Sequence, residues 1–198
     1  MKRQFFLHVL LLTLLVSCGP STKLAKSWTD PSVNPATTKP FTKVLVLGMV
    51  KDEATRRIVE DKLAAQFPGR AVQSYNYLSA ADTVDTQVEQ KLAKDGFDGI
   101  VYMRLANVEQ STSYVPGTTY GGFYGYHGYG YGMYGTQGYY QEDKTYNVET
   151  NIYSLNPPKL LWSGTTSSMN PGKVSATLDE IIMVIRDEFN KKGFVTKK

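Results

Sequence analysis

The order of apolar runs and helical patterns between residues 43 and 110 limits the fold of this chain more than any other feature. The run KVLVLGMV at residues 43–50 is almost continuously apolar and rich in β-branched side chains, which is typical of a strand covered on both faces. The next segments predict a helix, a strand, a helix and a longer strand over residues 53–67, 71–78, 83–95 and 99–110. The short links between them imply right-handed crossovers and a parallel sheet.

Both predicted helices carry an apolar stripe that would face the sheet. The stripes consist of Ala54, Ile58, Leu63 and Phe67 in the first helix and of Val84, Val88 and Leu92 in the second. Asp52 stands where it can cap the first helix. Arg56 lies four residues before Glu60 on that helix. Arg57 and Asp61 have the same spacing, so we expect two surface ion pairs, with a recognition patch as the alternative.

The pattern changes toward the carboxyl terminus. Residues 144–154, KTYNVETNIYS, alternate in polarity, which is typical of a half-exposed antiparallel strand, and residues 160–168 are its predicted hairpin partner. A last helix begins near Asn170 and ends at Gly193. Its apolar stripe consists of Leu178, Ile181, Ile182, Ile185 and Phe189. The predicted fold class is α/β, a mixed sheet in two or three layers in which a βαβαβ unit precedes a β-hairpin and a carboxyl-terminal helix.

The amino terminus has the three parts of a secretory signal. Two basic residues come first, an apolar run over residues 5–16 follows, and small residues surround Cys18. This run spans roughly 18 Å as a helix, which is short of a hydrocarbon core of about 30 Å. The segment LVSC that ends at Cys18 resembles the lipobox of bacterial lipoproteins, so we expect loss of residues 1–17 and lipid attachment at Cys18. The alternative is an ordinary secretory signal in which this single cysteine is incidental.

The resemblance to lipoproteins implies a place for the protein in the cell. Lipoprotein anchors carry more than one acyl chain, which gives stable attachment to a membrane. The residue after Cys18 is Gly19 rather than aspartate, and in this the chain resembles lipoproteins that are sorted to the outer membrane. The domain could lie on the periplasmic or on the outer face of that membrane. Without its signal the chain has 20 basic residues against 18 acidic ones, and no dense basic block, so no nucleic-acid surface is expected.

Residues 18–40 differ in composition from the rest of the chain. They are rich in Ser, Thr, Pro and Lys and hold few large apolar side chains, so we expect a flexible tether. Trp28 is the exception, and it either docks on the domain or lies at the lipid interface. Residues 41–198 then form a single α/β domain with one insertion.

The order of the motifs is similar to that in a group of uncharacterised bacterial envelope lipoproteins. The shared motifs are the lipobox, a tether that contains SWTDPS, the strands KVLVLGMV and AVQSYNYL, the helix TRRIVEDKL, the run DGIVYMRLANV and a late hairpin that ends KLLWSG. The topology also resembles the domain shared by the TolB amino-terminal region, the penicillin-binding-protein activator lipoproteins and the curli-secretion lipoprotein. The resemblance implies a non-enzymatic protein that contacts other envelope proteins or assembles with itself.

The insertion, at about residues 113–140, is a tract of glycine and aromatic residues. Glycine lets the backbone adapt, and tyrosine offers a flat surface with a polar tip, so the tract suits contact with proteins or sugars. The candidate contact residues are Tyr120, Phe123, Tyr124, Tyr126, Tyr129, Tyr131 and Tyr134. Three interpretations stay open: a surface insertion without a ligand, an adhesive contact, and a lid of tyrosines packed over the sheet.

The residue inventory speaks against several chemistries. His127 is the only histidine outside the signal, so a metal site of His and Cys lacks ligands, and its glycine neighbours make it a poorly held base. Ligands of parallel sheets favour the carboxyl ends of the strands, which predicts a crevice. The candidate crevice residues are Asp52, Glu53, Arg56, Tyr75 and Tyr77. Acidic residues at the helix start repel phosphate, so no nucleotide or other cofactor is expected.

We therefore expect a lipid-anchored envelope protein that acts as a non-catalytic binding or assembly module. Its expected partners are the membrane, through lipidated Cys18, and another envelope protein, a second copy or cell-wall glycan. The alternative is a carboxylate-dependent hydrolase or glycan-processing enzyme. Buried carboxylate pairs with a raised pKa in the crevice would favour the enzyme, whereas an apolar surface there would favour the module.

Overall fold

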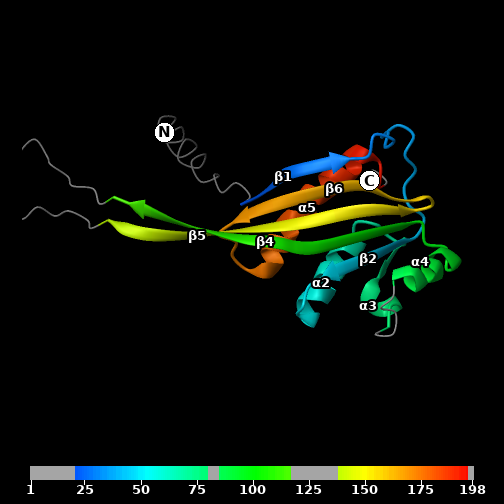
Figure 1. Cartoon of the computed structure of the whole chain (residues 1–198), viewed down its shortest axis with the longest axis horizontal. Coiled ribbons are helices and arrows are strands. Elements are labelled where there is room, and N and C mark those ends of the chain that lie inside the picture. The colour runs from blue at the N-terminus through cyan, green and yellow to red at the C-terminus, as the bar shows by residue number, and fades with distance from the viewer. Residues whose placement is uncertain (1–20, 80–84, 117–137, 196–198) are drawn as a thin grey trace, which may run out of the picture.

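The computed structural model describes residues 21–79, 85–116 and 138–195, which form a six-stranded mixed sheet and four helices (Figure 1). The strands are β1 (Thr22–Thr29), β2 (Val44–Met49), β3 (Ala71–Gln73), β4 (Gly99–Val115), β5 (Tyr139–Leu155) and β6 (Pro158–Met169). The helices are α2 (Glu53–Ala64), α3 (Ser74–Tyr77), α4 (Asp85–Lys94) and α5 (Val174–Lys192). Across the sheet the strands follow the order β1-β6-β5-β4-β2-β3.

The predicted fold class is confirmed. Strand β2 pairs in parallel with β3 and β4, whereas β4, β5, β6 and β1 pair antiparallel. The hairpin of β5 and β6 and the helix α5 follow the parallel unit, as the alternating and helical patterns predict. None of the described helices is long and apolar enough to cross a membrane.

Helices pack on both faces of the sheet. Helices α2 and α5 cover one face, where the predicted stripe of α5 is fully confirmed, since all five of its side chains are buried. The fully buried Trp162 contacts Phe189 of α5 edge to face, with the ring centroids 5.6 Å apart. On the other face Leu92 of α4 and Phe97 pack against Leu45 of β2. The sheet is thus enclosed between helices around β2, where its parallel strands lie.

The buried face of α2 differs from the predicted stripe. Ala54 and Ile58 are exposed, whereas Val59, Glu60 and Leu63 are buried. The reason is the carboxylate of Glu60, which turns inward and accepts hydrogen bonds from the backbone of β2 and from α3. Leu92 of the predicted α4 stripe is buried, and Val84 lies outside the described residues.

The two ion pairs predicted on α2 are also wrong. Both arginines form ion pairs with Glu53 instead. Arg56 Nε lies 2.9 Å and Arg57 Nε lies 2.8 Å from its carboxylate oxygens. Glu60 is buried, and Asp61 accepts a hydrogen bond of 2.6 Å from the Tyr75 hydroxyl instead. Spacing along a helix puts charges within reach of one another, but tertiary partners decide which pairs form.

The predicted second strand over residues 71–78 is interrupted. It pairs with β2 only as far as Gln73, and residues 74–77 then form the short helix α3. The Ser74 hydroxyl and the Tyr75 backbone N–H both donate to the Glu60 carboxylate, at 2.6 and 3.1 Å. These bonds turn the chain out of the sheet.

Part of the expected tether is an edge strand. Residues 22–29 form β1, which pairs antiparallel with β6, and the Thr22 and Ser168 hydroxyls share a buried hydrogen bond of 2.7 Å. Trp28 is part of β1 and is paired with Ser163, but its side chain is 48% exposed, so neither alternative for this side chain is decided. The ladder with β6 supplies the order that the polar composition of this segment cannot supply alone.

Strands β4 and β5 extend past the rest of the sheet as a two-stranded arm (Figure 1). Strand β6 ends at Met169, opposite Thr145, so beyond this point the described part of β5 pairs with β4 alone. We use the name arm for residues 111–115 and 139–143, and arm end for the end of the sheet that carries it. The arm includes both margins of the expected insertion as regular strand.

Candidate functional site: an apolar pocket near the base of the arm

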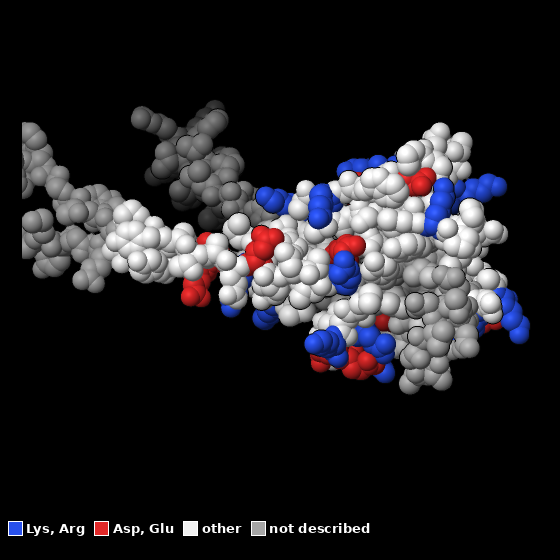
Figure 2. All heavy atoms as spheres, in the orientation of Figure 1, with Lys and Arg blue, Asp and Glu red and all other residues white. Residues whose placement is uncertain are grey.

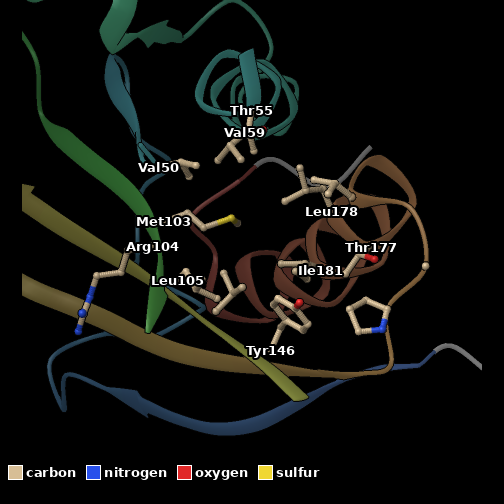
Figure 3. Close-up of a pocket in the computed structure, with 14 residues that line it drawn as sticks. Val50, Thr55, Val59, Met103, Arg104, Leu105, Tyr146, Thr177, Leu178 and Ile181 are labelled. Carbon is tan, nitrogen blue, oxygen red and sulfur yellow. The ribbon is translucent and has the colours of Figure 1, made fainter. Parts of the chain in front are cut away.

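A pocket of about 270 Å³ opens between the sheet and the amino-terminal ends of α2 and α5 (Figure 3). Val50 follows β2 directly, so the pocket borders the carboxyl end of a parallel strand, as the predicted crevice does. Strands β4 and β5 form its floor, with Leu105 paired to Val148. The loop before α5 forms the remaining wall.

The lining is almost entirely apolar. Its 14 residues are Val50, Thr55, Val59, Met103, Arg104, Leu105, Tyr146, Val148, Pro171, Gly172, Val174, Thr177, Leu178 and Ile181. Arg104 is the single charged residue among them, and its guanidinium group points away from the other side chains and pairs with Glu149 (Figure 3). The pocket therefore offers hydrophobic contact rather than charge.

The two threonine hydroxyls of the lining are already hydrogen-bonded. Thr55 Oγ1 donates to the Asp52 carboxylate at 2.6 Å, and Thr177 Oγ1 donates to the Lys173 carbonyl at 3.2 Å. Asp52 is the N-cap of α2 and lies outside the lining, which itself contains no carboxylate or histidine. A polar ligand would find few unused partners on these walls.

The acidic and basic residues of the predicted crevice lie beside the pocket and have structural partners. Asp52 is the N-cap of α2 and also accepts a hydrogen bond of 2.8 Å from the Thr55 backbone N–H. Glu53 holds Arg56, so the charges at this helix end satisfy one another. Thr55, rather than these three residues, reaches the pocket lining.

The two tyrosines of the predicted crevice lie elsewhere. Tyr75 donates to Asp61 and its ring lies 4.9 Å below the Arg57 guanidinium, which joins it to the surface of α2. Tyr77 belongs to the cluster on the other face of the sheet, where its hydroxyl donates to Asp95 at 2.7 Å. The structure therefore divides the predicted crevice between two faces of the sheet.

The pKa shifts on this surface have local causes. Hydrogen bonds from the Thr55 hydroxyl and backbone lower the pKa of Asp52, and hydrogen bonds from Arg56 and then Arg57 lower the pKa of Glu53. Throughout the described residues, each carboxyl group with a shifted pKa is shifted downward; the groups are Asp30, Asp52, Glu53, Asp143 and Glu180. A carboxylic acid that donates a proton near neutral pH needs a shift in the opposite direction.

Other predicted site residues lie outside the described residues. These are Cys18 and the tract residues Tyr120, Phe123, Tyr124, Tyr126, Tyr129, Tyr131 and Tyr134. In the described ranges, no three His, Cys, Asp or Glu side chains gather as a metal site would require. The residues that form the pocket come from distant segments of the chain, so the sequence did not predict them as a group. Only Val50 and Thr55 lie in the segment that was predicted to border a site, because it follows the carboxyl end of a parallel strand.

No family model and no curated protein matches the chain. Solved structures do. The PelC dodecamer from Paraburkholderia phytofirmans has a TM-score of 0.47 and 9% identity, over 89% of this chain and 99% of that chain. The lipoprotein GNA1162 from Neisseria meningitidis has a TM-score of 0.38 and 14% identity, over 76% and 99%. TolB from Acinetobacter baumannii has a TM-score of 0.35 and 13% identity, over 88% and 32%. Identities and TM-scores this low carry no function over to this chain.

Proposed function

We propose that this chain is a lipid-anchored protein of the bacterial envelope that acts as a non-catalytic binding module. Its binding site is the apolar pocket, which receives an apolar side chain of an envelope protein or of a second copy. The lipobox that ends at Cys18 supports the anchor. The composition of the pocket lining is the observation that supports the binding role.

An apolar pocket without acid or base suits binding better than hydrolysis. Glycoside hydrolysis needs a pair of carboxyl groups that flank the scissile bond, and the pocket lining has none. The one cationic residue of the lining, Arg104, forms an ion pair with Glu149. What the pocket does offer is the burial of an apolar group, which contributes about 25 cal/mol per Å² of surface removed from water.

A protein partner fits this lining better than a glycan does. Sugars present many hydroxyl groups, which would lose their hydrogen bonds to water on such walls. Leu105 and Val174 line the pocket and remain well exposed, so both can meet a partner's side chain at its mouth. Pockets of this kind hold the hot spots of many protein interfaces.

The anchor is tested by metabolic labelling. Cells that express the full chain are given a labelled fatty acid, and the chain with Cys18 is expected to take up the label. The Cys18→Ala variant is expected to stay unlabelled and to lose its membrane association. Equal labelling of both chains would overturn the anchor.

The pocket is tested by photo-crosslinking in cells. A photoreactive amino acid at Leu105, which is 49% exposed, is expected to form one discrete adduct. The control position is Met183 of α5, which is 57% exposed and lies outside the pocket lining, and no such adduct is expected there. The same adducts from both positions, or none from Leu105, would contradict a binding role for the pocket.

A further inference from the structure

The base of the arm is marked by one row of residues that crosses four strands. Thr22 of β1 is paired with Ser168 of β6, which is paired with Tyr146 of β5. Tyr146 is paired in turn with Val108 of β4. Strand β1 runs from Thr22 away from the arm, so its first residue lies at the arm end of the sheet (Figure 1).

This row relates the lipid anchor to the arm. Cys18 precedes Thr22 by four residues, which span at most about 14 Å when fully extended. From Val108 to Val115 the arm adds seven residues, which span about 23 Å at the rise of a β-strand. The arm thus extends farther from the row than the anchor can. A membrane that holds the acyl chains of Cys18 is within reach of the arm.

The outer part of the arm has the side chains of a membrane interface. Tyr114 and Tyr140 face each other across the ribbon with their ring centroids 5.2 Å apart, and they are 57% and 74% exposed. Val115 is paired with Tyr139, which is 59% exposed. Tyrosine has an apolar ring and a polar tip, and it is enriched where hydrocarbon meets water.

The distribution of charge agrees with this surface. Between Glu109 and Glu142 the sequence contains no Asp, Glu, Lys or Arg. In Figure 2 the outer arm is white, and the first acidic side chains appear at its base. At the arm end of the domain the apolar side chain of Met169 is 57% exposed. Its backbone N–H donates a hydrogen bond of 3.4 Å to the carbonyl of Ser21, three residues after Cys18.

The backbone limits how deep the arm can lie. The two strands of the arm pair only with each other among the described strands, so the outer edge of each leaves N–H and carbonyl groups to solvent. Such edges are too costly in hydrocarbon but are satisfied by water and lipid headgroups at the interface. Glu142 and Asp143 also keep the base of the arm in water.

We propose that the outer arm, residues 113–115 and 139–141, lies on the surface of the membrane that holds the anchor, with its tyrosines at the level of the headgroups. The inference rests on the proposed lipid anchor at Cys18. It gives the domain a defined orientation, with the arm end toward the bilayer and the apolar pocket beside it. Partners of the pocket are then met close to the membrane.

The chain is well suited to a test by fluorescence quenching. Cys18 is its only cysteine, and the lipid blocks that sulfur, so an introduced cysteine is the single site for a fluorophore. The mature lipidated protein carries the fluorophore at Ser113→Cys in the arm. The matched control is Ala36→Cys, at an exposed position in the loop beyond the opposite end of β1. Vesicles of phosphatidylethanolamine and phosphatidylglycerol carry a nitroxide on some headgroups.

Strong quenching at position 113 and none at position 36 is the expected result. Equal quenching at both positions, while the protein floats with the vesicles, overturns the inference and leaves the anchor intact. A protein that does not float overturns the proposed anchor and this inference together. If the labelled chain is not quenched and the unlabelled Ser113→Cys chain forms disulfides between copies on mild oxidation, the inference is overturned in favour of a contact between arms.

A second variant separates the tyrosines from the mere nearness of the anchor. In the labelled Ser113→Cys chain, Tyr114→Ser together with Tyr140→Ser is expected to abolish the quenching. The pair Tyr114→Trp and Tyr140→Trp is expected to retain it, because Trp suits the interface equally. Quenching that survives the serine pair would overturn the role of the tyrosines.

Discussion

The carboxylate of Glu60 is fully buried, although glutamate ordinarily stays in water. It accepts hydrogen bonds from the Gly48 N–H at 3.1 Å, the Ser74 hydroxyl at 2.6 Å and the Tyr75 N–H at 3.1 Å. These bonds connect α2 to β2 and to α3. Together with the apolar Val59 and Leu63, this side chain belongs to the buried face of α2, and its bonds to α3 lie where the second strand ends.

Removal of this carboxylate should destabilise the fold. Glu60→Ala leaves two buried donors and one partly buried donor without their acceptor, so we expect the free energy of unfolding to fall by about 3 kcal/mol. The matched control on the same helix is Glu53→Ala, which breaks only exposed pairs and should cost less than about 1 kcal/mol. Urea unfolding of both variants measures the difference, and equal losses would contradict the structural role of Glu60.

Asp52 makes stability depend on acid. Hydrogen bonds from Thr55 lower its pKa in the folded state below the ordinary value of 3.8. The ionised carboxylate therefore stabilises the fold above that value, and its contribution is lost as the pH falls through the lowered pKa. Asp52→Asn keeps a good helix cap but cannot titrate, so urea unfolding at several pH values should show a smaller loss in acid. An unchanged pH profile would contradict this cause.

At the scale of the element, β6 shows how one strand shapes the core. Trp162 fills the space between the sheet and α5, and Gly164 lies two residues farther along the same face. A Cβ at Gly164 would overlap the six-membered ring of Trp162. The ring of Trp162 therefore occupies the space that a side chain at position 164 would need, so the packing of this tryptophan depends on the glycine.

This fit predicts that Gly164 does not tolerate a methyl group. Gly164→Ala should lower the free energy of unfolding by about 1–3 kcal/mol, because the Trp162 ring or the strand must move. The control is Gly172→Ala, where no atom lies within 4 Å of the new Cβ. Urea unfolding compares the two variants, and the packing argument fails if the two behave alike.

At the scale of the whole molecule, the body and the arm are separate in space. The hydrophobic cores on the two faces of the sheet are built from the helices and the inner parts of the strands. Their members include no residue of the arm. Stability therefore belongs to the body, while the arm is available for contact with a surface outside it.

Shortening the arm tests this separation. Replacement of residues 111–143 by an Asn-Gly turn closes the hairpin at the pair of Gln110 and Lys144. We expect the melting temperature to change by less than about 4 °C, because the described part of the arm contributes no residue to the core. Differential scanning calorimetry measures it. A large fall would instead favour the interpretation in which the tract packs over the sheet as a lid.

The sequence alone determined the fold class and most elements, because the periods of helices and strands are local properties of the backbone. The stripe of α5, from Leu178 to Phe189, is the clearest case, since each of its members is buried. The apolar run of β2 correctly predicted a buried strand, and the alternation of β5 correctly predicted a strand. The predicted half exposure of β5 is wrong at Asn151, which is buried although it lies on the polar side. Such patterns predict which side of a helix or strand is buried, but they do not predict which other element packs against that side.

Tertiary structure decided the rest through partners that are distant in the chain. The polar segment of residues 22–29 became a strand because the edge of β6 offered hydrogen bonds. Glu60 lies on the buried face of α2, where its carboxylate accepts hydrogen bonds from Gly48 and Ser74. The apolar pocket joins four segments that no local pattern connects. Burial and strand pairing depend on contacts between segments that are distant in the sequence. A local pattern of residues contains no information on which distant segment will be the partner.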